Sequence, residues 1–216
     1  MKEKIKKLIW IVLKILRTGP LMLFIHPKSA LLKAGWFRSF HTGKVVDRNG
    51  NPIPWWTYSF IDFIEERLSK SFNVLEFGAG ASTIWLNERV NEVISVENDP
   101  FWADKMQKKS LSKSRIFYLR NSGEIHNQSY ILGKEYDIII IDNQGNRMDC
   151  AVSSLPLLKP EGVVIWDNTE GADWPEIKKF FIQKGFSEIS FSGMTPQILS
   201  YNRTTIFYRP GNCIKI

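Results

Sequence analysis

The chain has 216 residues, of which 44% are hydrophobic and 24% charged, a composition that excludes disordered and collagen-like proteins and fits one globular domain. Its two cysteines are too few for a disulfide framework or a zinc site. The formal net charge of +7 suggests at first a protein that binds nucleic acid or a membrane surface. Residues 1–50, however, hold 11 Lys and Arg against 2 Asp and Glu, and the rest of the chain has a balance of −2. The basic character therefore belongs to the N-terminal quarter.

Residues 1–25 are expected to form a basic, amphipathic segment that binds a membrane or a partner. Over residues 1–18 a broad apolar face lies opposite a charged side, a pattern that predicts an amphipathic helix. Gly19-Pro20 ends this helix before a second apolar run at 21–25. Lys14 and Arg17 interrupt the apolar stretch, and no small-residue cleavage site for a signal peptide follows it.

Three interpretations of this segment stay open. The favoured one is a helix that lies in the plane of an anionic membrane, since lysines flank Trp10 and a thick apolar face. The others are a helix packed against its own domain or a partner subunit, and a single-span anchor. Residues 26–54 are expected to be a connector, with a short helix around 30–35 and a turn cluster at 49–52.

From residue 55 to 216, short β-branched runs alternate with helical patterns, which predicts a doubly wound α/β domain with a mostly parallel sheet. A helix over 58–68, with Thr57 as a possible N-cap, precedes the first strand. The expected strands are 73–77, 93–97, 115–119, 136–142, 163–167, 186–191 and 204–208. The last two are expected to form a β-hairpin.

In such sheets ligands bind beyond the carboxyl ends of the strands. Gly78 and Gly80 follow the first expected strand and allow the backbone to turn tightly and approach a ligand. Thr83 stands where a dinucleotide fingerprint has its third glycine, which argues against NAD but allows a nucleoside without a pyrophosphate. Glu97 ends the second strand and is placed to accept ribose hydroxyls, although a solvated strand-end charge is the simpler alternative.

The sequence around these positions resembles the class I S-adenosylmethionine-dependent methyltransferases over about residues 55–210. The matching stretches are VLEFGAGAST, VISVEND, YDIIIIDNQ and LLKPEGVVIWDN. The resemblance implies the strand order 3-2-1-4-5-7-6 with an antiparallel last strand. It places the methionine part of the cofactor at the glycine loop, the ribose at Glu97 and the adenine near the end of the third strand. The implied cofactor contacts are Glu76, Gly78, Gly80, Ser82, Thr83, Glu97, Asn121, Ser122 and Asp142.

Oxygen-bearing side chains follow the fourth and fifth expected strands. Asp142, Asp167 and Asn168 together offer two carboxylates and an amide oxygen, which suit a magnesium ion. This arrangement is similar to the metal-dependent O-methyltransferases of the catechol and caffeoyl-coenzyme A type. Those enzymes resemble each other in placing a lysine base three residues after the first metal aspartate, where this chain has Gly145.

The identity of the general base is therefore left open. In a metal-free variant Asp142 itself takes the proton, and Arg147 is a candidate to bind an acidic group of the substrate. Asp142 and Arg147 are the candidate catalytic residues, with magnesium as a second candidate cofactor beside S-adenosylmethionine.

The acceptor is not expected to be nucleic acid. The base-specific methyltransferases have an Asn/Asp-Pro-Pro-aromatic motif after the fourth strand, and here that place reads Asp142-Asn143-Gln144-Gly145. The candidate substrate contacts are Trp56, Tyr58, Asn143 and Asn168. The aromatic side chains, with Phe40 and Trp55, form either a stacking wall for the acceptor or a packing joint, and the insertion 192–203 is a candidate lid.

The segments WFRS, GNPIPWWTY and EFGAG also resemble bacterial methyltransferases that accompany surface-polysaccharide genes. We therefore expect O-methylation of a small molecule, a glycan or a lipid-linked sugar, by a protein held peripherally at the cytoplasmic face of the inner membrane. The alternative is a membrane-tethered protein that binds S-adenosylmethionine without transferring its methyl group. The sequence leaves the oligomeric state open.

Overall fold

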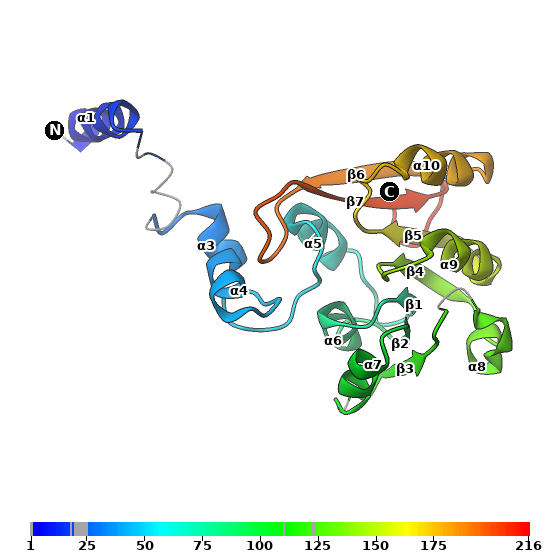
Figure 1. Ribbon diagram of the computed structural model, residues 1–216. Helices are drawn as coiled ribbons and strands as arrows, with labels where there is room; N and C mark the ends of the chain where they lie inside the picture. The colour runs from blue at the N-terminus through cyan, green and yellow to red at the C-terminus, as the bar shows by residue number, and fades with distance from the viewer. Residues whose placement is uncertain (1, 18, 20–25, 110, 122–123) are drawn as a thin grey trace.

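The computed structural model describes residues 2–17, 19, 26–109, 111–121 and 124–216. A single sheet has the order β3-β2-β1-β4-β5-β7-β6, which confirms the expected order (Figure 1). The strands are β1 (Asn73–Phe77), β2 (Glu92–Glu97), β3 (Ser114–Tyr118), β4 (Tyr136–Ile141), β5 (Leu158–Trp166), β6 (Ser187–Gly193) and β7 (Asn202–Tyr208). The first five pair in parallel, and β7 runs antiparallel to both β5 and β6.

The central strand β4 is buried along its whole length because helices cover both faces of the sheet. Its side chains alternate: Ile138 and Ile140 pack with α5 and α6, whereas Ile139 and Ile141 pack with α8, α9 and α10. These helices are α5 (Tyr58–Glu65), α6 (Ala81–Asn87), α8 (Ser129–Leu132), α9 (Arg147–Ser154) and α10 (Trp174–Gln183). A further helix, α7 (Pro100–Gln107), contacts β2 and β3, and two short 3-10 turns lie at η2 (Ile125–Asn127) and η3 (Leu155–Leu157).

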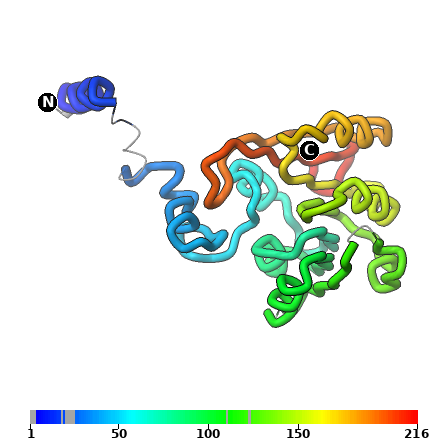
Figure 2. Tube along the Cα trace, in the orientation of Figure 1, coloured from blue at the N-terminus to red at the C-terminus, as the bar shows by residue number. Residues whose placement is uncertain are grey.

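The connector is more structured than the sequence indicates. It contains α3 (Ala30–Ala34), close to the expected short helix, and a second helix α4 (Trp36–Thr42) that was not expected. The indole N–H groups of Trp36 and Trp55 donate to the carbonyl oxygens of Ile198 and Pro196, at 3.1 and 2.7 Å. These bonds hold the connector beside the β6–β7 loop, as the two traces show in Figure 2.

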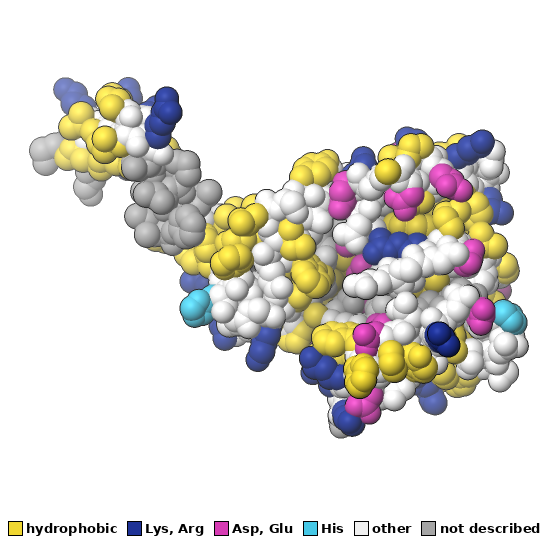
Figure 3. All heavy atoms as spheres, in the orientation of Figure 1, with side chains coloured by type: hydrophobic (Ala, Val, Ile, Leu, Met, Phe, Trp, Pro, Cys, Tyr) yellow, Lys and Arg dark blue, Asp and Glu magenta, His cyan; other side chains and the backbone are white. Residues whose placement is uncertain are grey.

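Helix α1 (Lys2–Ile15) confirms the expected N-terminal helix and lies apart from the sheet and its helices (Figures 1 and 2). Apolar and basic side chains both cover its surface (Figure 3). Its 14 residues extend about 21 Å, and none of the helices in the described residues is long and apolar enough to cross a membrane. The second apolar run, 21–25, and Pro20 lie outside the described residues.

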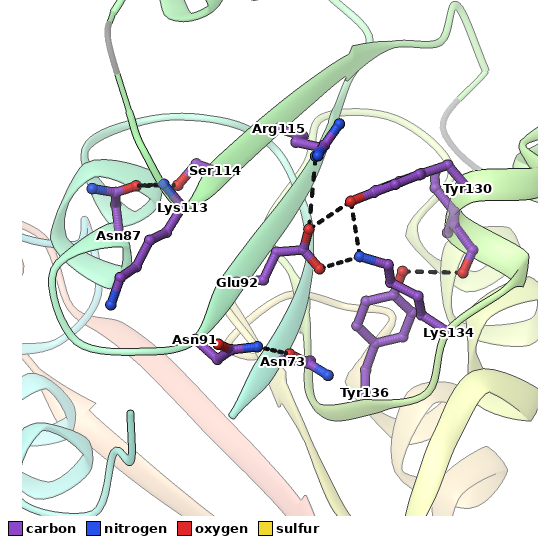
Figure 4. Close-up of polar contacts among 11 residues, drawn as sticks. Asn73, Asn87, Asn91, Glu92, Lys113, Ser114, Arg115, Tyr130, Lys134 and Tyr136 are labelled. Carbon is purple, nitrogen blue, oxygen red and sulfur yellow. Dashed lines mark hydrogen bonds and ion pairs between the residues drawn. The ribbon is translucent and has the colours of Figure 1, made fainter. Parts of the chain in front are cut away.

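A polar network fastens α8 to the amino ends of β2 and β3, at the edge of the sheet opposite the glycine loop (Figure 4). The Glu92 carboxylate accepts from Tyr130 Oη at 2.7 Å and pairs with Lys134 and, at 3.7 Å, with Arg115. Although burial opposes it, the hydrogen bonds from Lys134 and Tyr130 hold the pKa of Glu92 below its usual value. We interpret this network as structural.

Candidate functional site

The glycine loop that follows β1 is shaped by two glycines with different roles. Gly78 has φ +98°, and a Cβ there would lie 2.6 Å from the carbonyl oxygen of Asp142, so both conformation and space demand glycine. A Cβ on Gly80 would meet no atom of the described residues within 4 Å. The backbone at Gly80 is thus open to the approach of a ligand.

Buried side chains support this loop from below. Thr83 Oγ1 accepts from the Gly80 N–H at 2.9 Å and donates to Glu76 Oε2 at 2.5 Å, and the Ser95 hydroxyl donates to the same oxygen at 2.6 Å. Burial raises the pKa of Glu76 to about 7 despite these hydrogen bonds. Glu76 and Thr83 have no exposed surface, and Ser82 is 5% exposed. Glu76 and Thr83 therefore hold the loop, and the expected contacts of Glu76, Ser82 and Thr83 with the cofactor stay predictions.

Glu97, at the end of β2, links the glycine loop to the turn before α7. Its Oε2 accepts from the Ala79 N–H at 2.9 Å, and its Oε1 accepts from the N–H groups of Asn98 and Asp99, both at 2.8 Å. Within the described residues Oε2 thus takes one hydrogen bond and retains a second lone pair. The carboxylate can accept one hydroxyl of a ribose without losing its backbone partners.

Trp102 is a residue of this region that the sequence interpretation missed. Its indole N–H donates to the carbonyl oxygen of Ala79, and its backbone N–H donates to the capping carboxylate of Asp99 at 2.7 Å. The helix α7 is therefore anchored to the glycine loop. The pair Asp99-Pro100, an N-cap followed by proline at the first helical position, was the signal that could have placed this helix start beside the loop.

Two carboxyl groups lie at the adjacent ends of β4 and β5. Asp142 Oδ2 accepts from Trp56 Nε1 at 3.1 Å, and Asp167 Oδ1 accepts from Thr204 Oγ1 at 2.5 Å. Burial raises the pKa of Asp142 to about 6, although Arg147 and Trp56 favour its charged form. Burial and the charge of Asp142 raise the pKa of Asp167 well above its usual value. At neutral pH Asp142 is therefore mainly ionised, and its charge favours the protonated form of Asp167.

Arg147, the first residue of α9, spans the ends of the same two strands. Its Nε donates to the carbonyl oxygen of Asn143 at 2.7 Å, after β4, and its Nη1 to the carbonyl oxygen of Asp167 at 2.6 Å, after β5. Its Nη2 donates to Asn168 Oδ1 at 3.0 Å and lies 4.0 Å from Asp142 Oδ1. The guanidinium thus lies among the oxygen atoms that the sequence interpretation assigned to a metal.

No protein-family model matches this sequence, and no curated protein matches it. Solved structures do match. The O-methyltransferase TomG from Streptomyces achromogenes, in complex with SAM, has 15% identity and a TM-score of 0.56 over 85% of this chain and 91% of that one. A protein proposed to be a caffeoyl-CoA O-methyltransferase, from Staphylococcus aureus, has 17% identity and a TM-score of 0.57 over 90% and 99%. The precorrin-6y C5,15-methyltransferase of Geobacter metallireducens has 12% identity and a TM-score of 0.54 over 69% and 86%. The chain has the class I methyltransferase fold.

In this class I methyltransferase fold, the side-chain oxygen atoms of Asp142, Asp167 and Asn168 do not fit the magnesium ion that the sequence predicts. Asn168 Oδ1 already accepts from Arg147, and Asp167 is 2% exposed and accepts from Thr204 through Oδ1. A dication would have to displace the guanidinium or lie beside its positive charge. The contacts of Asp142, Asp167 and Asn168 therefore do not support the expected magnesium site.

The residues expected to contact the substrate differ in how far they are buried. Trp56 is fully buried, packs edge-on against Phe60 at 5.5 Å and holds Asp142, so it belongs to a packing joint. Asn143 is 2% exposed and uses its carbonyl oxygen to hold Arg147. Tyr58 is half-buried, and its N–H donates to the carbonyl oxygen of Met194 at 3.1 Å. Of the four aromatic side chains considered for the stacking wall, Phe40 and Trp55 are the exposed ones, at 57% and 45%.

The expected adenine contacts lie beyond β3. Asn121 is exposed, and its Nδ2 donates to Glu124 Oε1 at 2.9 Å. Ser122 lies outside the described residues. Both stay predictions.

Proposed function

We propose that this chain transfers the methyl group of S-adenosylmethionine to a hydroxyl oxygen. One observation carries the proposal: the open backbone of Gly80 and the carboxylate of Glu97 lie at the same sheet edge as the ionised carboxylate of Asp142. The O-methyltransferases among the matching folds add support.

The chemistry needs little beyond positioning and a base. The cofactor supplies a methyl group already activated as a sulfonium. Asp142 is held by the Trp56 N–H, retains 20% of its side-chain exposure and is ionised at neutral pH, so it can take the proton of an acceptor hydroxyl. The glycine loop is placed to hold the cofactor on the neighbouring strand, and alignment of the two reacting groups lowers the barrier to transfer.

A labelled methyl group separates this proposal from the alternative of a binding protein. The purified chain is incubated with methyl-labelled S-adenosylmethionine and extracts that contain glycans or lipid-linked saccharides. We expect label in the extract. Binding of S-adenosylhomocysteine with no label transferred to glycan, phenolic or lipid acceptors would instead favour a binding protein.

We further propose a glycan or lipid-linked sugar as acceptor, at the cytoplasmic face of a membrane. The surface of α1 and of the two residues after it supports a membrane location, because exposed apolar side chains lie beside several basic residues. The exposed apolar side chains are Ile5, Leu8, Ile9, Trp10, Ile11, Val12, Ile15 and Leu16. The basic residues beside them are Lys4, Lys6, Lys7, Lys14 and Arg17. Apolar burial and attraction to anionic headgroups then act together.

Removing residues 1–25 is expected to abolish sedimentation with vesicles of anionic phospholipid and to leave the binding of S-adenosylhomocysteine unchanged. The pair Leu8→Glu and Val12→Glu, which removes apolar area from the helix, should have the same effect. Neutral vesicles, or ~0.5 M salt, should weaken binding of the full chain because the basic side chains lose their attraction. A full chain that ignores anionic vesicles, or that changes from dimer to monomer on deletion, would show that α1 binds a protein partner instead.

A further inference from the structure

One positively charged group lies among the oxygen atoms at the ends of β4 and β5, and it is a side chain of the protein. Three of the five N–H groups of Arg147 pair with described oxygen atoms, two of which are the backbone carbonyls of Asn143 and Asp167. These bonds come from both strands, so they fix the plane of the guanidinium. The Arg147 side chain is 20% exposed, as is that of Asp142, so both reach the surface where an acceptor would enter.

The guanidinium lies where the sequence predicted a metal ion. Nη2 lies 3.0 Å from Asn168 Oδ1 and 4.0 Å from Asp142 Oδ1, between the amide and the carboxylate. Asn168 adopts φ +58°, a conformation that non-glycine residues rarely take, and its amide oxygen meets the guanidinium there. A guanidinium remains charged throughout the physiological pH range. The site therefore carries a permanent positive charge without binding an ion.

We propose that Arg147 takes the place of a divalent cation, so that this chain methylates its acceptor without a metal. This inference rests on the proposed function and names Arg147 as the source of positive charge at the site of methyl transfer. The other two N–H groups of Arg147 form no hydrogen bond among the described residues, so they can donate to an acceptor oxygen and orient it. The acceptor O–H bond breaks with its proton passing to Asp142, the O–CH₃ bond forms, and the S–CH₃ bond of the sulfonium breaks with its electron pair staying on sulfur.

Manganese tests the proposal without any acceptor, because its electron paramagnetic resonance signal distinguishes free from bound ion. The wild-type chain is expected to leave the Mn²⁺ signal unchanged. Arg147→Ala opens the oxygen atoms of Asp142, Asp167 and Asn168 to the ion and should raise Mn²⁺ affinity about tenfold or more. Arg147→Lys keeps the positive charge and should behave as wild type. Arg115→Met, which removes an arginine at the opposite edge of the sheet, is the matched control.

S-adenosylhomocysteine binding, measured on the same samples, reports the folded state and tests the proposed function separately. If the wild type did not bind S-adenosylhomocysteine, the proposed function would be contradicted. The proposal that Arg147 replaces a metal ion would not be contradicted by that result. The proposal is overturned if the wild type binds Mn²⁺ and Asp142→Asn abolishes the binding. It is also overturned if folded Arg147→Ala gains no Mn²⁺ affinity. If Arg147→Ala does not fold, the wild-type result decides, together with EDTA, which should leave labelled methyl transfer unchanged.

Discussion

Replacing Asp142 by asparagine is expected to lower the rate of methyl transfer by about 10² to 10⁴-fold. The substitution removes the base but preserves the shape of the side chain, and the amide oxygen can still accept from Trp56 Nε1. Binding of S-adenosylhomocysteine and the melting temperature should therefore stay close to wild type. Initial rates of label transfer, measured with the same acceptor extract for both proteins, give the comparison. Asp149→Asn, an exposed carboxyl on α9, controls for the loss of one charge.

The pH dependence should identify the same group. Asp142 has a pKa of about 6 and acts as a base only when ionised, so the rate should fall about tenfold per pH unit below pH 6 and level off above it. The residual rate of Asp142→Asn should lack this inflection. An unchanged rate in the variant, or a wild-type profile that is flat from pH 5 to about 8, would show that Asp142 is not the base.

Replacing Gly78 by alanine is expected to destabilise the fold by ~3 kcal/mol, because the positive φ and the overlap with a backbone carbonyl both act. The new Cβ would lie 2.6 Å from the Asp142 carbonyl oxygen, and neither that atom nor the loop can move freely inside the sheet edge. Urea unfolding followed by circular dichroism measures the change. Gly80→Ala, the same substitution two residues away, should cost little since its Cβ meets no described atom within 4 Å.

Equal stabilities of the two glycine variants would contradict this account of the loop. A large loss in both would mean that Gly80 is also structurally constrained, which would remove the argument that its open side receives a ligand.

The strands could be predicted because their short, apolar, β-branched runs are local signals. The buried run at 136–142 and the glycine loop after 77 lie within a residue or so of where the patterns place them. Strand β5 begins at Leu158, whereas the sequence predicted a start at 163. The prediction missed the first residues because they include Pro160 and Gly162, which local propensity does not favour in strands.

The site was only partly predictable, since its decisive contacts join residues far apart in sequence. That Trp56 holds Asp142 depends on how the chain before α5 approaches β4, and the same packing buries a ring that was one candidate for stacking on a substrate. The sequence indicated Arg147 as a substrate ligand, but its bonds to the ends of two strands appear only when β4 and β5 lie side by side. Oxygen-bearing residue types alone therefore suggested a metal where the fold places a guanidinium.

Calorimetric titration with S-adenosylhomocysteine tests the central claim most directly. We expect the wild-type chain to bind it, Gly80→Ala to bind about tenfold or more weakly because its methyl group occupies the open side of the loop, and Gly193→Ala, at another open glycine, to bind as wild type. Absence of binding to the folded wild type, or equal binding by Gly80→Ala, would contradict a cofactor site at this loop.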